Sequence, residues 1–299
     1  MNSNNCLLFL CRLIKVSIMN NLNDLHNWSG HFKASTLMPV LFLGHGSPMN
    51  AIEENEFVQG FRNIASTLPK PNAIVCISAH WFTQGTQITA MEKPPTIHDF
   101  TGFPPALYEV EYPANGNPPL AEYTKELLDP YLTPHKAILD EKWGLDHGAW
   151  SVIKHLYPKA DIPVIQISID YTKPPLYHFE LAQKLQILRK KGVLIIGSGN
   201  IVHNLRMVDW ENFDKDDYGY DWAIEARATI NKLLIEGNYN PLLKYQEQGM
   251  AFKLAIPSPD HYLPLIYTLG LQQKQDPIDL FNDKLLAGSL SMTSVKIGN

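Results

Sequence analysis

Five of the eleven histidines stand in short polar motifs where predicted strands end or loops turn. Neutral imidazole is the commonest metal ligand, and it is also the side chain best suited to moving protons near neutral pH. Cysteine occurs three times and never as a CxxC pair, so neither a thiolate zinc site nor a disulfide framework is indicated. The pattern therefore indicates an enzyme with a nitrogen and oxygen metal site. The five histidines are His45, His80, His147, His203 and His261.

Three of these histidines follow stretches that are typical of buried strands. The apolar run 38–44 ends just before His45. A second run, 72–78, ends just before His80, and a third precedes the glycine-rich turn that leads to His203. In open α/β sheets, ligands bind beyond the carboxyl ends of the strands. We therefore expect these imidazoles to converge although they are far apart in sequence.

Strand-like runs alternate with helical patterns along the whole chain. Helices are predicted over 56–68, 119–128, 150–157, 174–191, 220–234 and 258–269, and further strands over 86–91, 163–169, 193–197 and 289–297. This alternation predicts an α/β fold, a single domain with a mostly parallel central sheet flanked by helices. A long loop over 93–117 is rich in proline, glycine and aromatic residues, and loops of this length are usually functional.

Composition narrows the classes of function. The chain is 45% hydrophobic and 18% charged, which is ordinary for a globular protein, and its net charge of −5 argues against a nucleic-acid partner. No run approaches the roughly 20 apolar residues that span a membrane. Residues 1–37 lack a clear secretory leader and precede the first strong fold signals, so we interpret them as a poorly structured N-terminal extension of a catalytic domain over 38–299. We expect a cytoplasmic monomer or small homo-oligomer.

Each motif by itself also has a structural explanation. The glycines around His45 and before His203 suit tight turns, and neither turn completes a phosphate-loop or dinucleotide motif. Asp146 could orient His147 or cap the helix that follows it. His98 lies in the long loop, which could cover a pocket. Neither a GxSxG elbow nor an HExxH motif occurs, so a serine hydrolase and a zincin protease are not supported.

Six stretches carry a resemblance to a known family; they are 41–50, 78–82, 95–104, 143–148, 199–205 and 260–265. Together they resemble the DOPA 4,5-extradiol dioxygenase family, which lies within the class III extradiol ring-cleavage dioxygenases, the superfamily of the protocatechuate 4,5-dioxygenase β-subunit. The resemblance is close to the bacterial zinc-containing members. It extends over about residues 38–298.

The resemblance implies an α/β fold with a deep metal pocket. It also implies a reaction in which both oxygen atoms of O2 open a catechol ring next to its hydroxyl groups. His203 takes the place of the acid/base histidine, close enough to complete a four-histidine zinc shell. His147 is implied to contact substrate or oxygen, and we expect His98 to help bind the substrate. The metal ligands that the resemblance implies are His45, His80 and His261.

These implications lead to two enzymatic hypotheses. The first is an extradiol dioxygenase that acts on a catechol such as DOPA, with one divalent metal per chain, Fe2+ for ring cleavage or Zn2+ as isolated. The usual iron oxygenase site has two histidines and a carboxylate, whereas here the third motif offers His261 with Asp260 beside it. The alternative is a zinc-dependent hydrolase or lyase on the same scaffold, with zinc-bound water as nucleophile and His203 as base. A non-catalytic metal-binding protein would not need the additional acid/base histidine.

Overall fold

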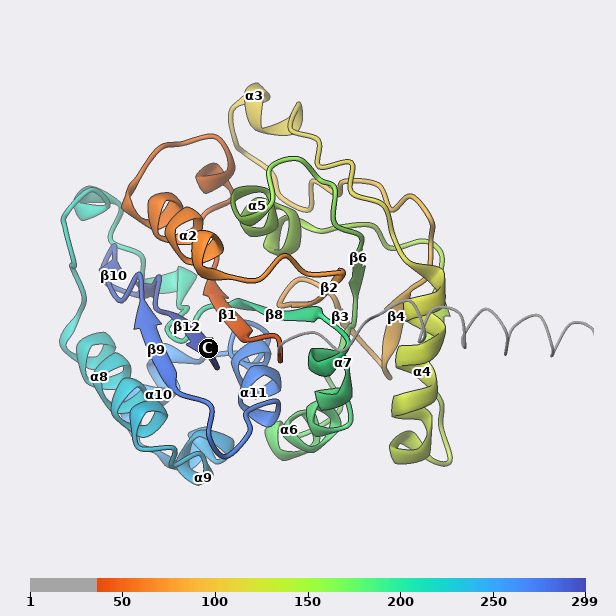
Figure 1. The fold of residues 1–299 in the computed structure, drawn as a ribbon. Helices are drawn as coiled ribbons and strands as arrows, with labels where there is room; N and C mark the ends of the chain where they lie inside the picture. The colour runs from red at the N-terminus through yellow and green to blue at the C-terminus, as the bar shows by residue number, and fades with distance from the viewer. Residues whose placement is uncertain (1–36) are drawn as a thin grey trace, which may run out of the picture.

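A six-stranded sheet runs through the middle of the computed structural model, which describes residues 37–299 (Figure 1). The first four strands in spatial order are parallel, and the last two are antiparallel to their neighbours. The predicted mostly parallel sheet is therefore confirmed. The predicted extension over 1–37 lies outside the described residues apart from Leu37. In spatial order the strands are β6 (Val164–Gln166), β2 (Ala73–Ser78), β8 (Val193–Gly199), β1 (Val40–Gly44), β12 (Ser294–Ile297) and β9 (Ile278–Phe281).

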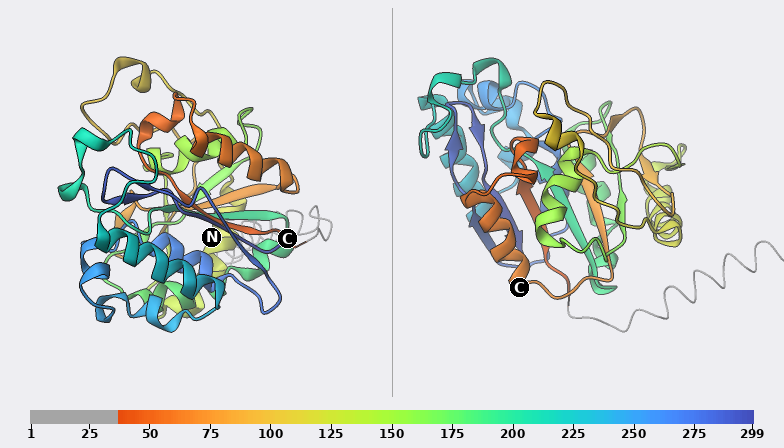
Figure 2. Two further views of the ribbon diagram at one scale, coloured as in Figure 1. Left: turned by 90° about the vertical axis from the view of Figure 1, so that its left-hand side faces the viewer. Right: turned by 90° about the horizontal axis from the view of Figure 1, so that it is seen from above.

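Helices cover both faces of this sheet (Figures 1 and 2). One face carries α2 (Glu56–Thr67) and α5 (His147–Leu156). The other carries α6 (Pro175–Gln183), α7 (Gln186–Lys190), α8 (Asp221–Ile235), α9 (Asn240–Leu243), α10 (Met250–Ala255) and α11 (Leu263–Gly270). The remaining helices are α3 (Pro105–Tyr108), α4 (Pro118–Leu132), η1 (Pro48–Ala51), η2 (Leu205–Met207), η3 (Trp210–Asn212) and η4 (Tyr245–Glu247). Within residues 37–299, no helix combines the length and the apolar character needed to cross a membrane.

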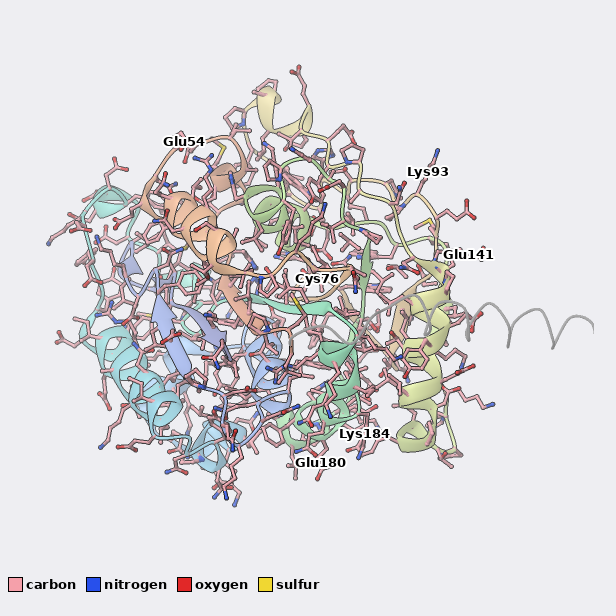
Figure 3. The ribbon with its side chains drawn as sticks, in the orientation of Figure 1. Glu54, Cys76, Lys93, Glu141, Glu180 and Lys184 are labelled. Carbon is pink, nitrogen blue, oxygen red and sulfur yellow. The ribbon has the colours of Figure 1, made fainter. Side chains whose placement is uncertain are left out.

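The central strands read as continuous apolar runs because both of their faces are buried. In β1, Phe42 belongs to the core beneath α11, whereas Leu41 belongs to the core beneath α2 and α5. Cys76 in β2 lies in this second core, and Figure 3 shows it in the interior while Lys93 and Glu141 lie at the outside. Two apolar cores, one on each face of the sheet, pack against the strands whose ends carry the histidine motifs.

Several predicted strands are shorter than expected or lie outside the main sheet. The strand predicted over 86–91 is β4 (Gln87–Thr89), which pairs with β5 (Ile138–Asp140) rather than with the central strands. The strand predicted over 163–169 is divided into β6 and β7 (Ile169–Asp170), and β7 pairs with β3 (Phe82–Thr83). The strand predicted over 289–297 is likewise divided into β11 (Leu290–Ser291), which pairs with β10 (Leu285–Leu286), and β12.

Two predicted helices differ from the observed ones for reasons that involve distant contacts. The single helix predicted over 174–191 is wrong, because it is broken between α6 and α7. The second segment carries Arg189 into the interior, where its guanidinium donates hydrogen bonds to Met38 O and Leu271 O and pairs with Asp276. The helix predicted over 258–269 begins only at Leu263, since the preceding residues form turns that belong to the site described below.

Candidate metal centre

Three histidines meet at the carboxyl ends of the parallel strands β1, β2 and β8. His45 directly follows β1, and His80 follows β2 by two residues. His261 reaches the same edge because its carbonyl oxygen accepts a hydrogen bond of 2.9 Å from the amide of Asn200, the residue after β8. One ligand nitrogen of each of the three imidazoles lies within 4.8 Å of the others. The predicted convergence of strand-end histidines thus holds for His45 and His80.

Glycines in the motifs allow these close approaches. A Cβ atom on Gly199 would lie 2.1 Å from the carbonyl oxygen of His261. A Cβ atom on Gly148 would lie 2.7 Å from Cδ2 of His80. Real side chains do not tolerate either distance, so glycine is required at both positions for the histidines to occupy their places.

The hydrogen bonds of His45 fix its tautomer. Its Nδ1 lies 3.0 Å from Oγ of Ser198, and that hydroxyl donates its proton to the carbonyl oxygen of Gly148. Since a hydroxyl has a single proton to donate, Ser198 can only accept a hydrogen bond from His45. The proton of neutral His45 is therefore on Nδ1, which leaves the lone pair of Nε2 free for a metal.

Carboxylates fix the other two imidazoles in the same way. Nδ1 of His80 lies 3.2 Å from Oδ2 of Asp99, and Nδ1 of His261 lies 2.5 Å from Oδ2 of Asp260. Burial raises the pKa of Asp99, but hydrogen bonds from His147 and His80 outweigh it and hold that pKa well below the usual range. The pKa of Asp260 is lowered in the same way, since its hydrogen bond with His261 outweighs burial. Both groups are ionised acceptors, so both imidazoles carry their proton on Nδ1.

His45 and His80 face each other through the ring nitrogens that do not contact Ser198 or Asp99. Their Nε2 atoms are 3.3 Å apart. Two nitrogens bound to one tetrahedral zinc ion at about 2.0–2.1 Å each would be separated by roughly the same distance. Two lone pairs at this spacing repel unless a proton or a metal ion lies between them, and the spacing is also the one that a divalent metal bound to both nitrogens requires. The carboxylates of Asp99 and Asp260, one hydrogen bond further out, offset its charge and orient its ligands, as carboxylates commonly do behind metal-binding histidines.

Burial keeps two members of this group uncharged. The pKa of His45 is well below its ordinary value because of burial and the neighbouring His80. Burial also lowers the pKa of His261, against the opposing hydrogen bond from Asp260. Burial alone would lower the pKa of His80 too, but its hydrogen bond to Asp99 raises it overall. Neutral imidazole is the ligand form, so the environment favours metal binding at His45 and His261.

His147 is the first residue of α5 and lies against His80, with ring centroids 3.9 Å apart. Its Nδ1 and its backbone amide both donate to Oδ1 of Asp99, at 3.0 and 2.8 Å. Asp146 caps α5 by accepting a hydrogen bond from the amide of Ala149. Of the two explanations for Asp146, the cap is therefore observed, and Asp99 orients His147 instead.

Asp99 is the residue of this site that sequence reasoning missed. Its only signal was its place beside His98 in a motif that the resemblance used. Oxygen and nitrogen atoms of His80, Asp99 and His147 are also close enough together to hold a metal. Their contacts, however, are N–H to carboxylate hydrogen bonds, which account for the spacing without an ion.

His203 lies beside the three-histidine group. Its ring stacks on His261 with centroids 3.5 Å apart and planes 10° apart. Among the described residues, the group of ligand nitrogens within 4.8 Å comprises His45, His80 and His261 and does not include His203. Burial, aided by His261, lowers the pKa of His203 to about 2, so its imidazole is neutral at neutral pH.

His98 belongs to an aromatic wall built by the long loop. Its Nε2 donates a hydrogen bond of 2.9 Å to the carbonyl oxygen of Val110, across the loop. Its ring lies 5.7 Å from that of Phe100, and Phe100 in turn contacts His147 at 5.5 Å between centroids. The structure therefore places His98 one aromatic ring away from His147 rather than within the histidine group.

Comparison with known proteins identifies the family of this chain. Residues 39–293 match the family described as the catalytic LigB subunit of aromatic ring-opening dioxygenase. The chain belongs to this family. It is 49% identical over 269 residues to a 4,5-DOPA dioxygenase extradiol of Escherichia coli K12, covering 89% of this chain and 96% of the relative. It is 35% identical over 262 residues to a 4,5-DOPA dioxygenase extradiol of Beta vulgaris, covering 86% of this chain and 95% of the relative.

A crystal structure of an uncharacterised protein from Escherichia coli K12 has the same fold. It superposes with a TM-score of 0.72 at 42% sequence identity, and the match covers 87% of this chain and 100% of that one. The resemblance inferred from the sequence motifs is thus confirmed, and this LigB-family chain is an extradiol ring-cleaving dioxygenase of a metal-dependent family. The comparisons give no support to the hydrolase or lyase alternative.

Proposed function

We propose that this dioxygenase holds one divalent metal ion on His45, His80 and His261 and cleaves a DOPA-like catechol beside its hydroxyl groups. The observation that carries the metal site is the convergence of one ligand nitrogen each from His45, His80 and His261 within 4.8 Å, with 3.3 Å between the Nε2 atoms of His45 and His80. Fe2+ is the ion for ring cleavage, and Zn2+ fits the same three imidazoles in the protein as isolated. When bound, Fe2+ with open coordination positions supplies the means to bring catechol and O2 together.

His203 is the proposed acid/base residue. Because burial keeps it unprotonated, it can accept a catechol proton at neutral pH and later return it. The negative charge of the deprotonated catechol raises the affinity of a neighbouring imidazole for that proton. Its stacking on His261 keeps it beside the metal ligands throughout the reaction. The Zn2+ affinity of His203→Ala tests whether His203 also becomes a fourth zinc ligand.

His147 and His98 are the proposed substrate-side residues. Asp99 holds the Nδ1–H of His147, which leaves Nε2 as the ring nitrogen that can contact substrate or oxygen. His98 contributes by fixing the loop, since its bond to Val110 braces the segment that carries Phe100. The aromatic rings of that segment shield the reacting groups from water.

The relatives support the proposed substrate class. The chain is similar over most of its length to proteins named 4,5-DOPA dioxygenase extradiol in a bacterium and in a plant, which supports a catechol with an amino-acid side chain. We further propose that residues 38–299 form the catalytic domain. The few cysteines suit a cytoplasmic protein, and the acidic charge balance suits one without a nucleic-acid partner. We propose that it is a monomer or small homo-oligomer.

Metal exchange tests this function. The metal is removed anaerobically, and separate samples are reloaded with Fe2+ or Zn2+. Each sample then receives L-DOPA and air, while the yellow ring-opened product and O2 uptake are followed. We expect turnover in the Fe2+ sample and none in the Zn2+ sample, with one O2 consumed per molecule of product. Turnover of simpler catechols but not of L-DOPA would contradict the proposed substrate, and turnover without any divalent metal would contradict the metal site.

A further inference from the structure

We propose that Asp99 is a positioning residue that fixes the tautomers of His80 and His147 together and thereby keeps His80 able to bind metal. The inference rests on the proposed role of His80 as a metal ligand. It concerns a residue that is not one of the proposed metal ligands and is not one of the five motif histidines. The inference is based on the number of N–H groups that contact the carboxylate of Asp99.

Three N–H groups point at the two oxygens of Asp99. Oδ1 lies 2.8 Å from the backbone amide of His147 and 3.0 Å from Nδ1 of the same residue. Oδ2 lies 3.2 Å from Nδ1 of His80. An ionised carboxylate accepts at both oxygens and donates at neither, so it satisfies all three contacts with both imidazoles protonated at Nδ1.

An amide of the same shape cannot do this. In an Asp99→Asn variant, one oxygen is replaced by an NH2 group that only donates. If the remaining oxygen stays with the two N–H groups of His147, the NH2 group faces Nδ1 of His80. His80 can then keep a hydrogen bond only by moving its proton to Nε2. That tautomer has no Nε2 lone pair and cannot bind the metal.

The opposite orientation of the amide is no better. With its oxygen toward His80, the NH2 group would face two N–H groups of His147, one of them the amide at the start of α5. The NH2 group of the variant would then face only N–H groups, and none of these donors would have an acceptor. The side chain of His147 is only 8% exposed, so water cannot easily replace the lost acceptor. Burying unpaired donors in this way is costly, so this orientation is the less stable one.

Asp260 provides a matched control. It makes the same kind of contact, from Oδ2 to Nδ1 of His261, but serves a single imidazole and is 25% exposed. In Asp260→Asn the amide can turn its oxygen to His261 and its NH2 group toward solvent. The tautomer of His261 is therefore preserved, although the interaction weakens because the acceptor is no longer charged.

The test combines metal affinity with a direct view of the tautomers. Zn2+ affinity of the full chain is measured by competition with a chromophoric chelator, and 15N NMR of the metal-free protein assigns the protonated nitrogen of each imidazole. We expect Nδ1–H at His80 and His147 in the wild type and Nε2–H at His80 in Asp99→Asn. Zn2+ binding should weaken by about 10- to 100-fold in Asp99→Asn, as for other carboxylates behind ligands, and by less in Asp260→Asn.

The possible failures can be told apart. Wild-type Zn2+ affinity with unchanged tautomers in Asp99→Asn would overturn the proposal for Asp99. The wild-type spectrum tests it even if that variant does not fold, because a bare Nδ1 on His80 or His147 would overturn it equally. If instead His45→Ala and His261→Ala bind Zn2+ as well as the wild type does, the metal site itself has been misassigned.

Discussion

His203 and His261 lie face to face, with ring centroids 3.5 Å apart and ring planes only 10° from parallel. His261 belongs to the group of convergent ligand nitrogens, whereas His203 does not. The stack therefore fixes the position of the proposed proton-handling side chain relative to a proposed metal ligand. The two histidines are therefore assigned different roles, metal ligand for His261 and acid/base residue for His203, which the sequence motifs alone did not distinguish.

Replacing His203 distinguishes these two roles. His203→Ala should lower kcat by about 10²- to 10⁴-fold, the usual contribution of a positioned acid or base, while Zn2+ affinity changes by less than about tenfold. His203→Phe retains the aromatic stack and serves as the matched variant; it should bind Zn2+ like the wild type and be equally inactive. Stopped-flow turnover and chelator competition give the two numbers. A loss of Zn2+ affinity as large as that of His45→Ala would instead make His203 a fourth ligand.

Removing the acceptor of His45 should weaken the metal site without touching a ligand. In Ser198→Ala, the buried Nδ1–H of His45 loses its partner, which costs about 1–3 kcal/mol and releases the ring from its tautomer. We expect Zn2+ affinity to fall roughly tenfold, in line with other changes behind metal ligands. Ser151→Ala is the control, because the hydroxyl of Ser151 is buried without a hydrogen-bond partner among the described residues. Equal Zn2+ affinities in the two variants would refute the role of Ser198.

A methyl group at Gly199 should displace His261. The new Cβ would lie 2.1 Å from the His261 carbonyl oxygen, which belongs to the backbone and cannot rotate away. We expect Gly199→Ala to bind Zn2+ more weakly and to unfold at a lower temperature. Gly85→Ala is a useful comparison, since Gly85 has open space around it and a φ of +80°. That change should lower stability by about 1 kcal/mol without altering metal affinity, so equal metal affinity in both variants would count against the argument.

The sequence predicted the parts of the site that depend on strand ends. Apolar runs locate β1 and β2, and the carboxyl-end rule for parallel sheets places His45 and His80 together. His261 could be assigned only through resemblance, because it reaches the sheet edge by a backbone hydrogen bond from Asn200, which no periodicity indicates.

Other features required the folded chain. Asp99 could not be found from spacing, since its partners His80 and His147 lie 19 and 48 residues away along the sequence. The break between α6 and α7 is equally hidden, because it accompanies the buried bonds of Arg189 to Met38 and Leu271, which are far from it in the sequence. Local patterns predict which face of an element is apolar, but they carry no information about a polar partner that arrives from elsewhere.

His178 should make stability depend on pH independently of the metal site. It is fully buried between α6 and α11, its Nδ1 lies 3.1 Å from the hydroxyl of Tyr267, and burial lowers its pKa to about 4. In the unfolded chain its pKa returns to about 6.5. The folded protein therefore keeps His178 neutral where the unfolded chain binds a proton, so stability present above pH 6.5 is lost progressively as the pH falls toward 4.

The size of this loss of stability follows from the pKa shift of His178. A pKa difference of about 2.5 corresponds to a loss on the order of 3 kcal/mol for a group as buried as His178. His178→Gln keeps a hydrogen-bonding group but cannot titrate, so its unfolding free energy should decline less steeply over the same interval. Urea unfolding of both proteins between pH 7 and pH 4 measures the difference, and the other buried histidines cancel because both proteins carry them. Parallel curves for the two proteins would show that His178 is not held neutral by burial.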